Sequence, residues 1–367
     1  MTFVSSIANT LVQLQAKPVL YPLIKEVMGC NTPKTLVVRN QNEMLDVATG
    51  QFGGTICFFG SGIVLDRILK PLYQSILRHP HLLPNPKAAL EWTRLGKSFG
   101  IYSLQGALYW AVPFFRNFLT SRRSGTHNFI QMVGVQRKPD VINLQKLKEK
   151  QAYSLGMVRN IVTGGVIASA LSIGASIYAI RKGLAINKPA AFLLKHLGLG
   201  GGSFKNYPRW AEFFFIAVAS YVGWIHATRD KFELKEQLLQ FGSFLFGWFV
   251  PPLLFERYFK GRLRSLLKNE ALFKKVMGTN AQGQLNSKLN ISNIRKFLAK
   301  SPALKQAEAL AVYEFAAGMG VSVVLLATLP QLLNFKLTKK RVARSHLPNL
   351  PQPQIPYPRF SPTVPLQ

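Results

Sequence analysis

Six uncharged stretches alternate along this chain with connections rich in lysine and arginine. A helix needs about 20 apolar residues to cross the hydrocarbon core of a bilayer, and each stretch is close to that length. The pattern therefore predicts an all-α, polytopic integral membrane protein with about six membrane-embedded helices. The predicted embedded segments are 47–65, 98–115, 161–180, 213–228, 238–255 and 315–335.

The remaining segments complete the predicted organisation. We expect an N-terminal extramembrane region over 1–46, a helical membrane domain over 47–335, and a basic, then proline-rich, disordered tail over 336–367. Within the membrane domain, two basic connections, 141–159 and 257–277, carry apolar residues at helical spacing. This spacing predicts cationic amphipathic helices at the membrane interface. For 257–277 the alternative is a helix that covers a domain of the protein itself.

The 257–277 connection holds seven Lys or Arg residues and a single acid, Glu270. Cations on an interfacial helix attract the anionic headgroups of lipids, so membrane lipids are the expected partner. The candidate headgroup-binding residues are Arg257, Lys260, Arg262, Arg264, Lys268, Lys274 and Lys275.

Small residues recur every four positions within three of the stretches. In lipid such rows let two helix backbones approach closely, so they predict contacts with other helices of this chain or of a protein partner. The candidate packing residues are Gly50, Gly54, Gly164, Ala168, Ser172, Ala316 and Gly320.

Charge narrows the choice of partner. Lys and Arg number 46 against 15 Asp and Glu, a formal net charge of +31, which is typical of proteins that bind nucleic acid or anionic lipid. The basic clusters adjoin apolar stretches, which favours lipid, and we do not expect nucleic acid as a partner. The expected location is the bacterial inner (plasma) membrane, with the mitochondrial inner membrane as the alternative.

Topology does not follow from the same charges. If all six stretches cross the bilayer, the Lys and Arg residues of the connections divide nearly evenly between the two sides. The positive-inside rule needs an asymmetry, so orientation stays open, as does the choice between full spans and re-entrant hairpins.

Candidate chemistry is sparse. His226 and Asp230 lie one helical turn apart, the spacing of a base and an orienting carboxylate, against the alternative of a boundary histidine beside a solvated acid. Cys30 and Cys57 are expected to be reduced thiols, and the sequence predicts neither a metal site nor a cofactor. An enzyme is therefore not the favoured interpretation.

Three functions remain open. The favoured one is a non-enzymatic membrane scaffold or assembly subunit that contacts anionic lipid. The first alternative is a transporter or channel for an uncharged or anionic solute, because the connections are positive and the stretches hold no acid. The second alternative is a membrane-bound enzyme resembling a lipid acyltransferase, acting through His226 and Asp230.

Overall fold

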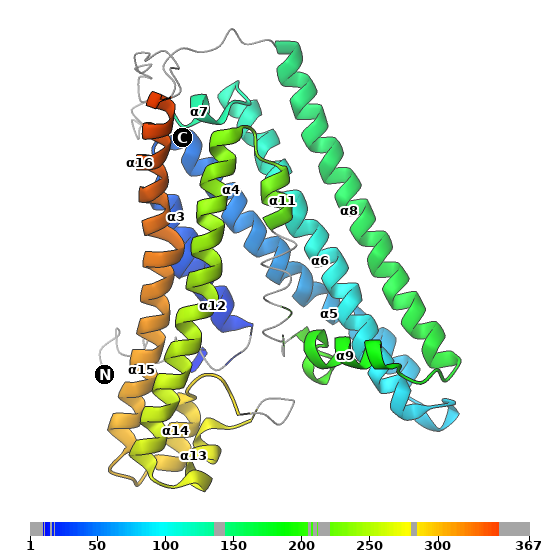
Figure 1. Cartoon of the computed structure of the whole chain (residues 1–367). Coiled ribbons are helices and arrows are strands. Elements are labelled where there is room, and N and C mark those ends of the chain that lie inside the picture. The colour runs from blue at the N-terminus through cyan, green and yellow to red at the C-terminus, as the bar shows by residue number, and fades with distance from the viewer. Residues whose placement is uncertain are drawn as a thin grey trace, which may run out of the picture.

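The computed structural model describes residues 10, 12–14, 17, 19–135, 144–204, 207, 211, 221–279 and 285–344. This part of the chain is 84% helical and contains no strand, so the all-α prediction is confirmed. Long helices run side by side through the molecule, with α7 at one end and α13 and α14 at the other (Figure 1).

Four helices of the described chain are long and apolar enough to cross a membrane. Two of them are interrupted by π-helical turns, which join shorter α-helices into one rod. The four are Gln41–Leu77, made of α4 (Gln41–Thr55), η2 (Ile56–Gly60) and α5 (Ser61–Leu77); α8 (Leu144–Arg181); α12 (Lys231–Leu267); and Leu304–Arg344, made of α15 (Leu304–Val321), η7 (Ser322–Thr328) and α16 (Leu329–Arg344).

The other helices are α6, which has 39 residues, and a set of short elements. Their bounds are α2 (Leu20–Ile24), η1 (Lys25–Asn31), α3 (Thr32–Leu36), η3 (Pro80–Leu82), α6 (Pro86–Ser124), α7 (Phe129–Met132), α9 (Lys188–Leu197), η4 (Gly200–Gly202), α11 (Tyr221–His226), α13 (Glu270–Met277) and α14 (Ile291–Leu298).

Four of the six predicted segments lie on these four apolar helices, namely 47–65, 161–180, 238–255 and 315–335. Segment 98–115 lies on α6, which is not among the four because serine, glutamine and tyrosine dilute its apolar residues. Segment 213–228 falls mostly outside the described residues, which include only its end, in α11.

Helices α6 and α8 pack along most of their length through small residues. A Cβ at Gly165 would overlap the Cβ of Ala107, and a Cβ at Gly100 would lie 2.9 Å from Ile173. Ser169 donates a hydrogen bond to the Gly100 carbonyl oxygen (2.7 Å). Small side chains at this interface therefore let the two backbones meet closely, as expected for helices that associate in lipid.

The contact on α8 uses a different row of small residues from the predicted one. Gly164 and Ala168 are exposed, and a Cβ at Gly164 would meet nothing within 4 Å. The packed row, which includes Gly165, Ser169 and Ser176, lies one position further along the chain. Spacing alone identifies a row of small residues but does not show which of two adjacent rows faces the neighbouring helix.

The predicted row on α15 is also not the packed one, whereas the predicted row on α4 does lie at close contacts. Ala316 and Gly320 are exposed on α15, and Gly318 faces Tyr21 instead. On α4, a Cβ at Gly50 would lie 2.5 Å from Trp224, and one at Gly54 would lie 2.9 Å from Tyr109. Ser172, the third member of the α8 row, is half-buried.

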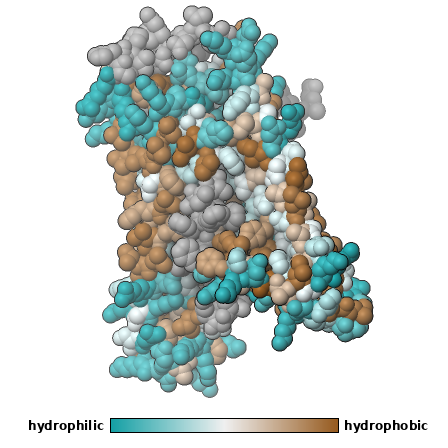
Figure 2. Space-filling view, turned by 45° about the vertical axis from the view of Figure 1, so that its right-hand side comes forward, coloured by the Kyte–Doolittle hydropathy of each residue, from teal (hydrophilic) through white to brown (hydrophobic). Residues whose placement is uncertain are grey.

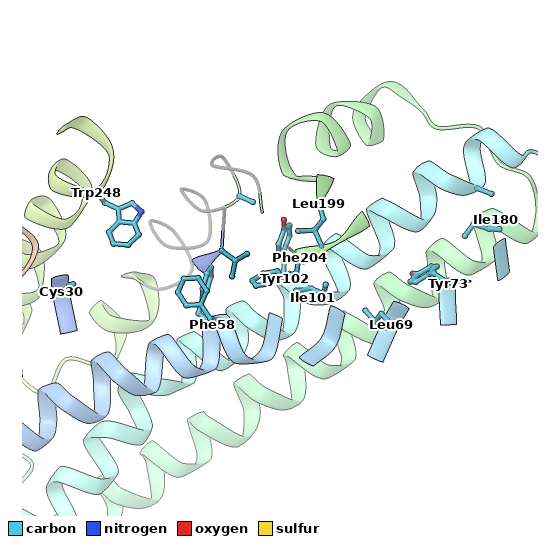
Figure 3. Packing of buried hydrophobic residues seen from close by; sticks show 14 of the residues in the cluster. Cys30, Phe58, Leu69, Tyr73, Ile101, Tyr102, Ile180, Leu199, Phe204 and Trp248 are labelled. Carbon is cyan, nitrogen blue, oxygen red and sulfur yellow. The ribbon is translucent and has the colours of Figure 1, made fainter. Parts of the chain in front are cut away.

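Aromatic and aliphatic side chains fill the space between η2, α5, α6 and the chain after α9. Tyr102, Leu199 and Phe204 gather at one point between the ribbons, with Phe58 beside them (Figure 3). The Tyr102 hydroxyl donates to the Leu197 carbonyl oxygen (2.9 Å), so this buried ring leaves its polar end satisfied.

The predicted interfacial helix over 257–277 is two helices. Residues 257–267 continue α12, and Lys268 then adopts a left-handed conformation (φ 51°) before α13 begins at Glu270. The apolar sides of both helices are buried in a second core cluster, with Leu263, Phe273 and Met277 fully covered by α14 and α15. This arrangement matches the alternative of helices that cover the protein's own domain.

The predicted boundaries differ from the structure in two other places. Residues 141–159 are not a separate helix, since from Leu144 onward they form the first half of α8. Residues 20–36, expected outside the membrane domain, pack against η7 in the middle of a candidate spanning helix, where the Cys30 thiol faces the Leu326 carbonyl oxygen (3.9 Å). Of the predicted disordered tail, 336–344 belongs to α16 and 345–367 lies outside the described residues.

The surface carries a hydrophobic belt between two hydrophilic ends (Figure 2). Large apolar side chains such as Ile167, Leu171, Leu254 and Val324 are more than half exposed within the belt helices. In water such a continuous apolar surface would drive association, whereas a bilayer covers it.

We expect Gly165→Ala and Gly164→Ala to separate the packed row of α8 from the open one. The first should destabilise the protein by about 1–3 kcal/mol, because its methyl group overlaps Ala107. The second should be neutral or slightly stabilising, because alanine is the better helix former. Thermal unfolding in detergent measures both, and equal midpoints for the two variants would contradict the packing.

Candidate functional site

Helices α4 and α12 begin with the same local motif. Each has an arginine, then an Asn or Asp at the N-cap, then a glutamate in the first turn. The Asn40 side chain accepts from the Glu43 N–H (2.9 Å), and the Arg39 N–H donates back to the Glu43 carboxylate (2.5 Å). Such reciprocal bonds satisfy the free N–H groups of a helix start.

The start of α12 repeats this geometry. Asp230 accepts from the N–H groups of Phe232 (2.8 Å) and Glu233 (2.9 Å), and the Arg229 N–H donates to the Glu233 carboxylate (2.6 Å). The two helix starts are therefore equivalent, although 190 positions separate Arg39 from Arg229.

The two motifs are joined by crossed ion pairs. Arg39 binds its own Glu43 (2.6 Å) and also Glu236 of the second motif (2.8 Å). Arg229 binds its own Glu233 (2.8 Å) and also Asp46 of the first motif (2.9 Å). We call this set the crossed cluster, and it consists of Arg39, Glu43, Asp46, Arg116, Arg229, Glu233 and Glu236.

Helices α6 and α16 support the two halves in the same way. Thr120 on α6 donates to Asp46 (2.7 Å), and Thr338 on α16 donates to Glu236. Both helices also carry the pattern Pro-x-x-x-Asn-Phe ahead of these threonines, at 113–118 and 330–335. The crossed cluster thus lies between two similar helical units, α4 with α6 and α12 with α16.

Helix α7 connects the two N-caps. The Phe129 N–H donates to the Asp230 carboxylate (3.2 Å), and the Asn40 amide donates to the Met132 carbonyl oxygen (3.0 Å). The Phe129 ring lies 5.3 Å from the Arg39 guanidinium and 5.4 Å from that of Arg229. This near-equal spacing places Phe129 close to the centre of the repeated arrangement.

Arg116 on α6 has no charged counterpart at the equivalent position of α16. It binds Glu233 (2.6 Å) and lies 3.5 Å from Asp46, with the Trp224 ring 4.6 Å from its guanidinium. Arg116 lies three residues after Pro113. The corresponding position on α16, three residues after Pro330, is Leu333, which is 39% exposed. One unit therefore supplies a third guanidinium to the four carboxylates of the crossed cluster.

The crossed cluster is almost completely shielded from solvent, and its Arg229 and Glu233 side chains are each 1% exposed. Burial opposes the charge of Arg229, but attraction from Asp46 and Glu233 outweighs that cost and raises the pKa of the guanidinium. The pKa of Arg39 is raised in the same way by Glu43 and Glu236. Both arginine side chains therefore stay charged at physiological pH.

Nearby groups respond to the same environment. Burial, reinforced by the positive charge of Arg229, lowers the pKa of His127 to about 4, so its imidazole is neutral at pH 7. Burial also raises the pKa of Asp230, although its oxygens accept backbone N–H groups. The neutral His127 therefore adds no charge to the crossed cluster near pH 7.

A small cavity of about 30 Å³ adjoins the crossed cluster. That space holds about two water molecules and no larger solute. Its wall combines cluster residues with Lys34 and with amide side chains, of which Gln240 and Gln331 are joined by a hydrogen bond (2.7 Å). In this conformation the polar interior leaves room for little more than water.

The structure does not bring the predicted catalytic pair together. The Asp230 carboxylate accepts three backbone N–H groups, and the His226 ring stands edge-on to Phe114 (5.4 Å between centroids). No hydrogen bond joins His226 to Asp230 in the described structure. The two residues do not share a helix, because α11 ends at His226 and Asp230 is the N-cap of α12.

The predicted headgroup-binding cations stand at the end of the molecule opposite the crossed cluster. Two of them are engaged locally, since Lys260 pairs with Glu256 (2.8 Å) and Arg264 with Glu270 (3.1 Å). The exposed ones on α12, α13 and the turn between them are Arg257, Arg262, Arg264, Lys268, Lys274 and Lys275.

The crossed cluster was missed in the sequence, although two signals point to it. The uncharged stretches were bounded by charged residues, and several of those boundary residues, including Asp46 and Arg116, are themselves buried. The second signal is the repeated Arg-Asx-x-x-Glu-x-x-acid pattern at 39–46 and 229–236.

Comparison with known proteins gives no relative: no protein family, no curated protein and no solved structure matches this chain. Among the described residues, no group of three or more His, Cys, Asp or Glu side chains could hold a metal ion.

We expect Arg229→Gln to destabilise the protein by about 3–5 kcal/mol, because it leaves Asp46 and Glu233 as buried charges with too few partners. Arg123→Gln, at an exposed position near the end of α6, is the matched control and should shift stability by less than about 0.5 kcal/mol. Unfolding in detergent measures both variants. Similar small shifts for the two would show that the crossed cluster contributes little.

Proposed function

We propose that this protein is a non-enzymatic multi-pass membrane protein that serves as a scaffold or assembly subunit and contacts anionic lipid. One observation carries the proposal: the charged groups of the crossed cluster are paired with one another beside a cavity of only about 30 Å³, while the apolar helices turn outward. A scaffold offers its outer surface, whereas an enzyme or a pore needs an accessible interior.

The outward apolar surface supports the membrane location. Only 17% of the most apolar window of α8, and 17% of that of α12, is buried within the described structure. Leu171 and Leu254 are exposed by 68% and 62%. Side chains of this kind are stabilised by acyl chains or by apolar faces of other membrane proteins.

The four apolar helices are the first candidates for spans, and we propose that α6 and the segment over 213–228 complete a set of six embedded helices. Helix α6 packs along α8, and its flanking charges are internally neutralised, since Lys97 pairs with Asp66 (2.8 Å) and Arg116 with Glu233. Pairing lowers the cost of placing such groups near lipid. The bacterial plasma membrane is the location we favour, with the mitochondrial inner membrane as the alternative.

The exposed cations of α12 and α13 support contact with anionic headgroups. Most of their apolar side chains are buried in the second core cluster, so the outward side is mainly charged, with Tyr258 also exposed on it. Contact with lipid is then electrostatic, at the level of the headgroups, rather than through insertion of the helices among acyl chains. Each Lys or Arg near an anionic membrane surface contributes about 1 kcal/mol.

A transporter is the second candidate, and the duplication favours it. Many transporters consist of two similar helical units that meet at a central polar site. Here the two units meet at the crossed cluster and its cavity, and separation of Arg39 from Glu236 and of Arg229 from Asp46 would open a polar path. Flux of a solute into vesicles that depends on the protein would favour this candidate over the scaffold. The acyltransferase alternative has no support in the geometry of His226 and Asp230.

We expect the full-length protein in lipid nanodiscs to enrich phosphatidylglycerol over phosphatidylcholine. A triple variant, Arg257→Gln, Arg262→Gln and Lys274→Gln, should reduce that enrichment, because it removes three exposed charges for which the described structure shows no ion-pair partner. The matched control, Arg257→Lys, Arg262→Lys and Lys274→Arg, keeps the charge and should behave like the wild-type protein.

Quantification of the co-purified lipids measures the effect. Equal lipid ratios for the wild-type protein and the glutamine variant would refute contact with anionic lipid at this surface. Release of the wild-type protein from membranes by alkaline carbonate would refute the membrane location itself.

A further inference from the structure

A hollow lies on the outer side of α12 and α16, in the part of the molecule that we propose to be within the membrane. It has a volume of about 390 Å³ and is open at the surface. We call it the outer groove. It is lined by Leu238, Leu239, Gly242, Ser243, Phe246, Leu325 and Leu329.

The lining is apolar and exposed. Leu238, Phe246 and Leu329 expose 47%, 53% and 43% of their surface. A Cβ at Gly242 would meet nothing within 4 Å, so the absence of a side chain there deepens the outer groove without any packing reason inside the protein. An open apolar groove at this place is covered by an acyl chain once the protein is in a bilayer.

Three contacts define the register between α12 and the continuous helix formed by η7 and α16. The Asn334 amide donates to the Glu236 carbonyl oxygen (3.2 Å), and Gln240 bonds to Gln331 (2.7 Å). Further along, a Cβ at Gly247 would lie 2.7 Å from Leu326. The residue numbers rise on one helix as they fall on the other, so the two helices are antiparallel.

This register places two lysines at one end of the outer groove. Lys235 is one turn from Leu238 and Leu239 on α12, and in the antiparallel register it is level with Lys336 of α16. Both lysines are exposed, and neither has a hydrogen-bond or ion-pair partner in the described structure. Lys336 lies two turns from Leu329, on the same side of its helix.

The length of the outer groove fits one leaflet. From Lys235 to Phe246 the helix rises by about 16 Å, at about 1.5 Å per residue. Half of a hydrocarbon core of about 30 Å is about 15 Å. A chain that starts at the level of the two lysines therefore ends near the middle of the bilayer.

We propose that the outer groove binds a single phospholipid, with one acyl chain along Leu239, Gly242 and Phe246 and an anionic headgroup held by Lys235 and Lys336. The site rests on the membrane location proposed above and is separate from the cations of α12 and α13 at the far end. It combines the two elements that lipid recognition needs, an apolar slot and positive charge at headgroup depth.

The test uses the purified full-length protein and native mass spectrometry with added phosphatidylglycerol. Gly242→Leu should abolish one bound lipid, because the new side chain fills the outer groove without a clash in the protein. Gly320→Leu is the matched control, since Gly320 is also exposed on a candidate spanning helix and a Cβ there meets nothing within 4 Å. It should bind as the wild-type protein does.

The lysines are tested in the same experiment. The double variant Lys235→Gln, Lys336→Gln should bind phosphatidylglycerol about 30-fold more weakly, since two headgroup contacts are lost. Its binding of phosphatidylcholine should change far less. A preference for phosphatidylglycerol that survives in the double variant would overturn the assignment of the headgroup site.

Two outcomes separate this proposal from the one on which it rests. If the wild-type protein resists carbonate extraction but Gly242→Leu and Gly320→Leu retain lipid equally, the outer groove is not a lipid site, although the membrane location stands. If the wild-type protein is extracted by carbonate, the membrane location fails and the lipid site fails with it.

Discussion

The crossed pairing of Arg39 with Glu236 and of Arg229 with Asp46 is the constraint on which the helical body depends. Each arginine binds one acid of its own helix start and one of the other. A charge withdrawn from water must be paired, so neither helix start can move without breaking the network. The first helix of the bundle is thereby tied to a helix that begins 190 residues later in the chain.

The same constraint separates a paired polar interior from an apolar exterior. The cavity beside the crossed cluster is small, whereas the apolar helices and the cationic end face outward. The lipid contacts that we propose therefore all lie on the outside of the protein, at the belt, at the cations of α12 and α13, and in the outer groove. The repeated units leave a second role open, because crossed pairs that hold two similar halves together are also able to part.

The sequence predicted the helical class and four of the apolar helices, because long uncharged runs report directly on burial in lipid. It did not predict which helical row packs, since Gly164 and Gly165 belong to adjacent rows with nearly the same spacing. It also missed the crossed cluster, because partners such as Arg39 and Glu236 are distant in sequence and only folding brings them together. The catalytic pair His226 and Asp230 was proposed from spacing on one helix, and the end of α11 before Asp230 removes that premise.

A double-mutant cycle between Arg39 and Glu236 tests the central claim most directly. The unfolding free energies of Arg39→Gln, Glu236→Gln and the double variant would be compared with that of the wild-type protein in the same detergent. If the crossed pair couples the two helical units, the double variant will be more stable than the sum of the single effects implies, by about 0.5–3 kcal/mol. Effects that add to within about 0.5 kcal/mol would contradict the account, because the two side chains would then act independently.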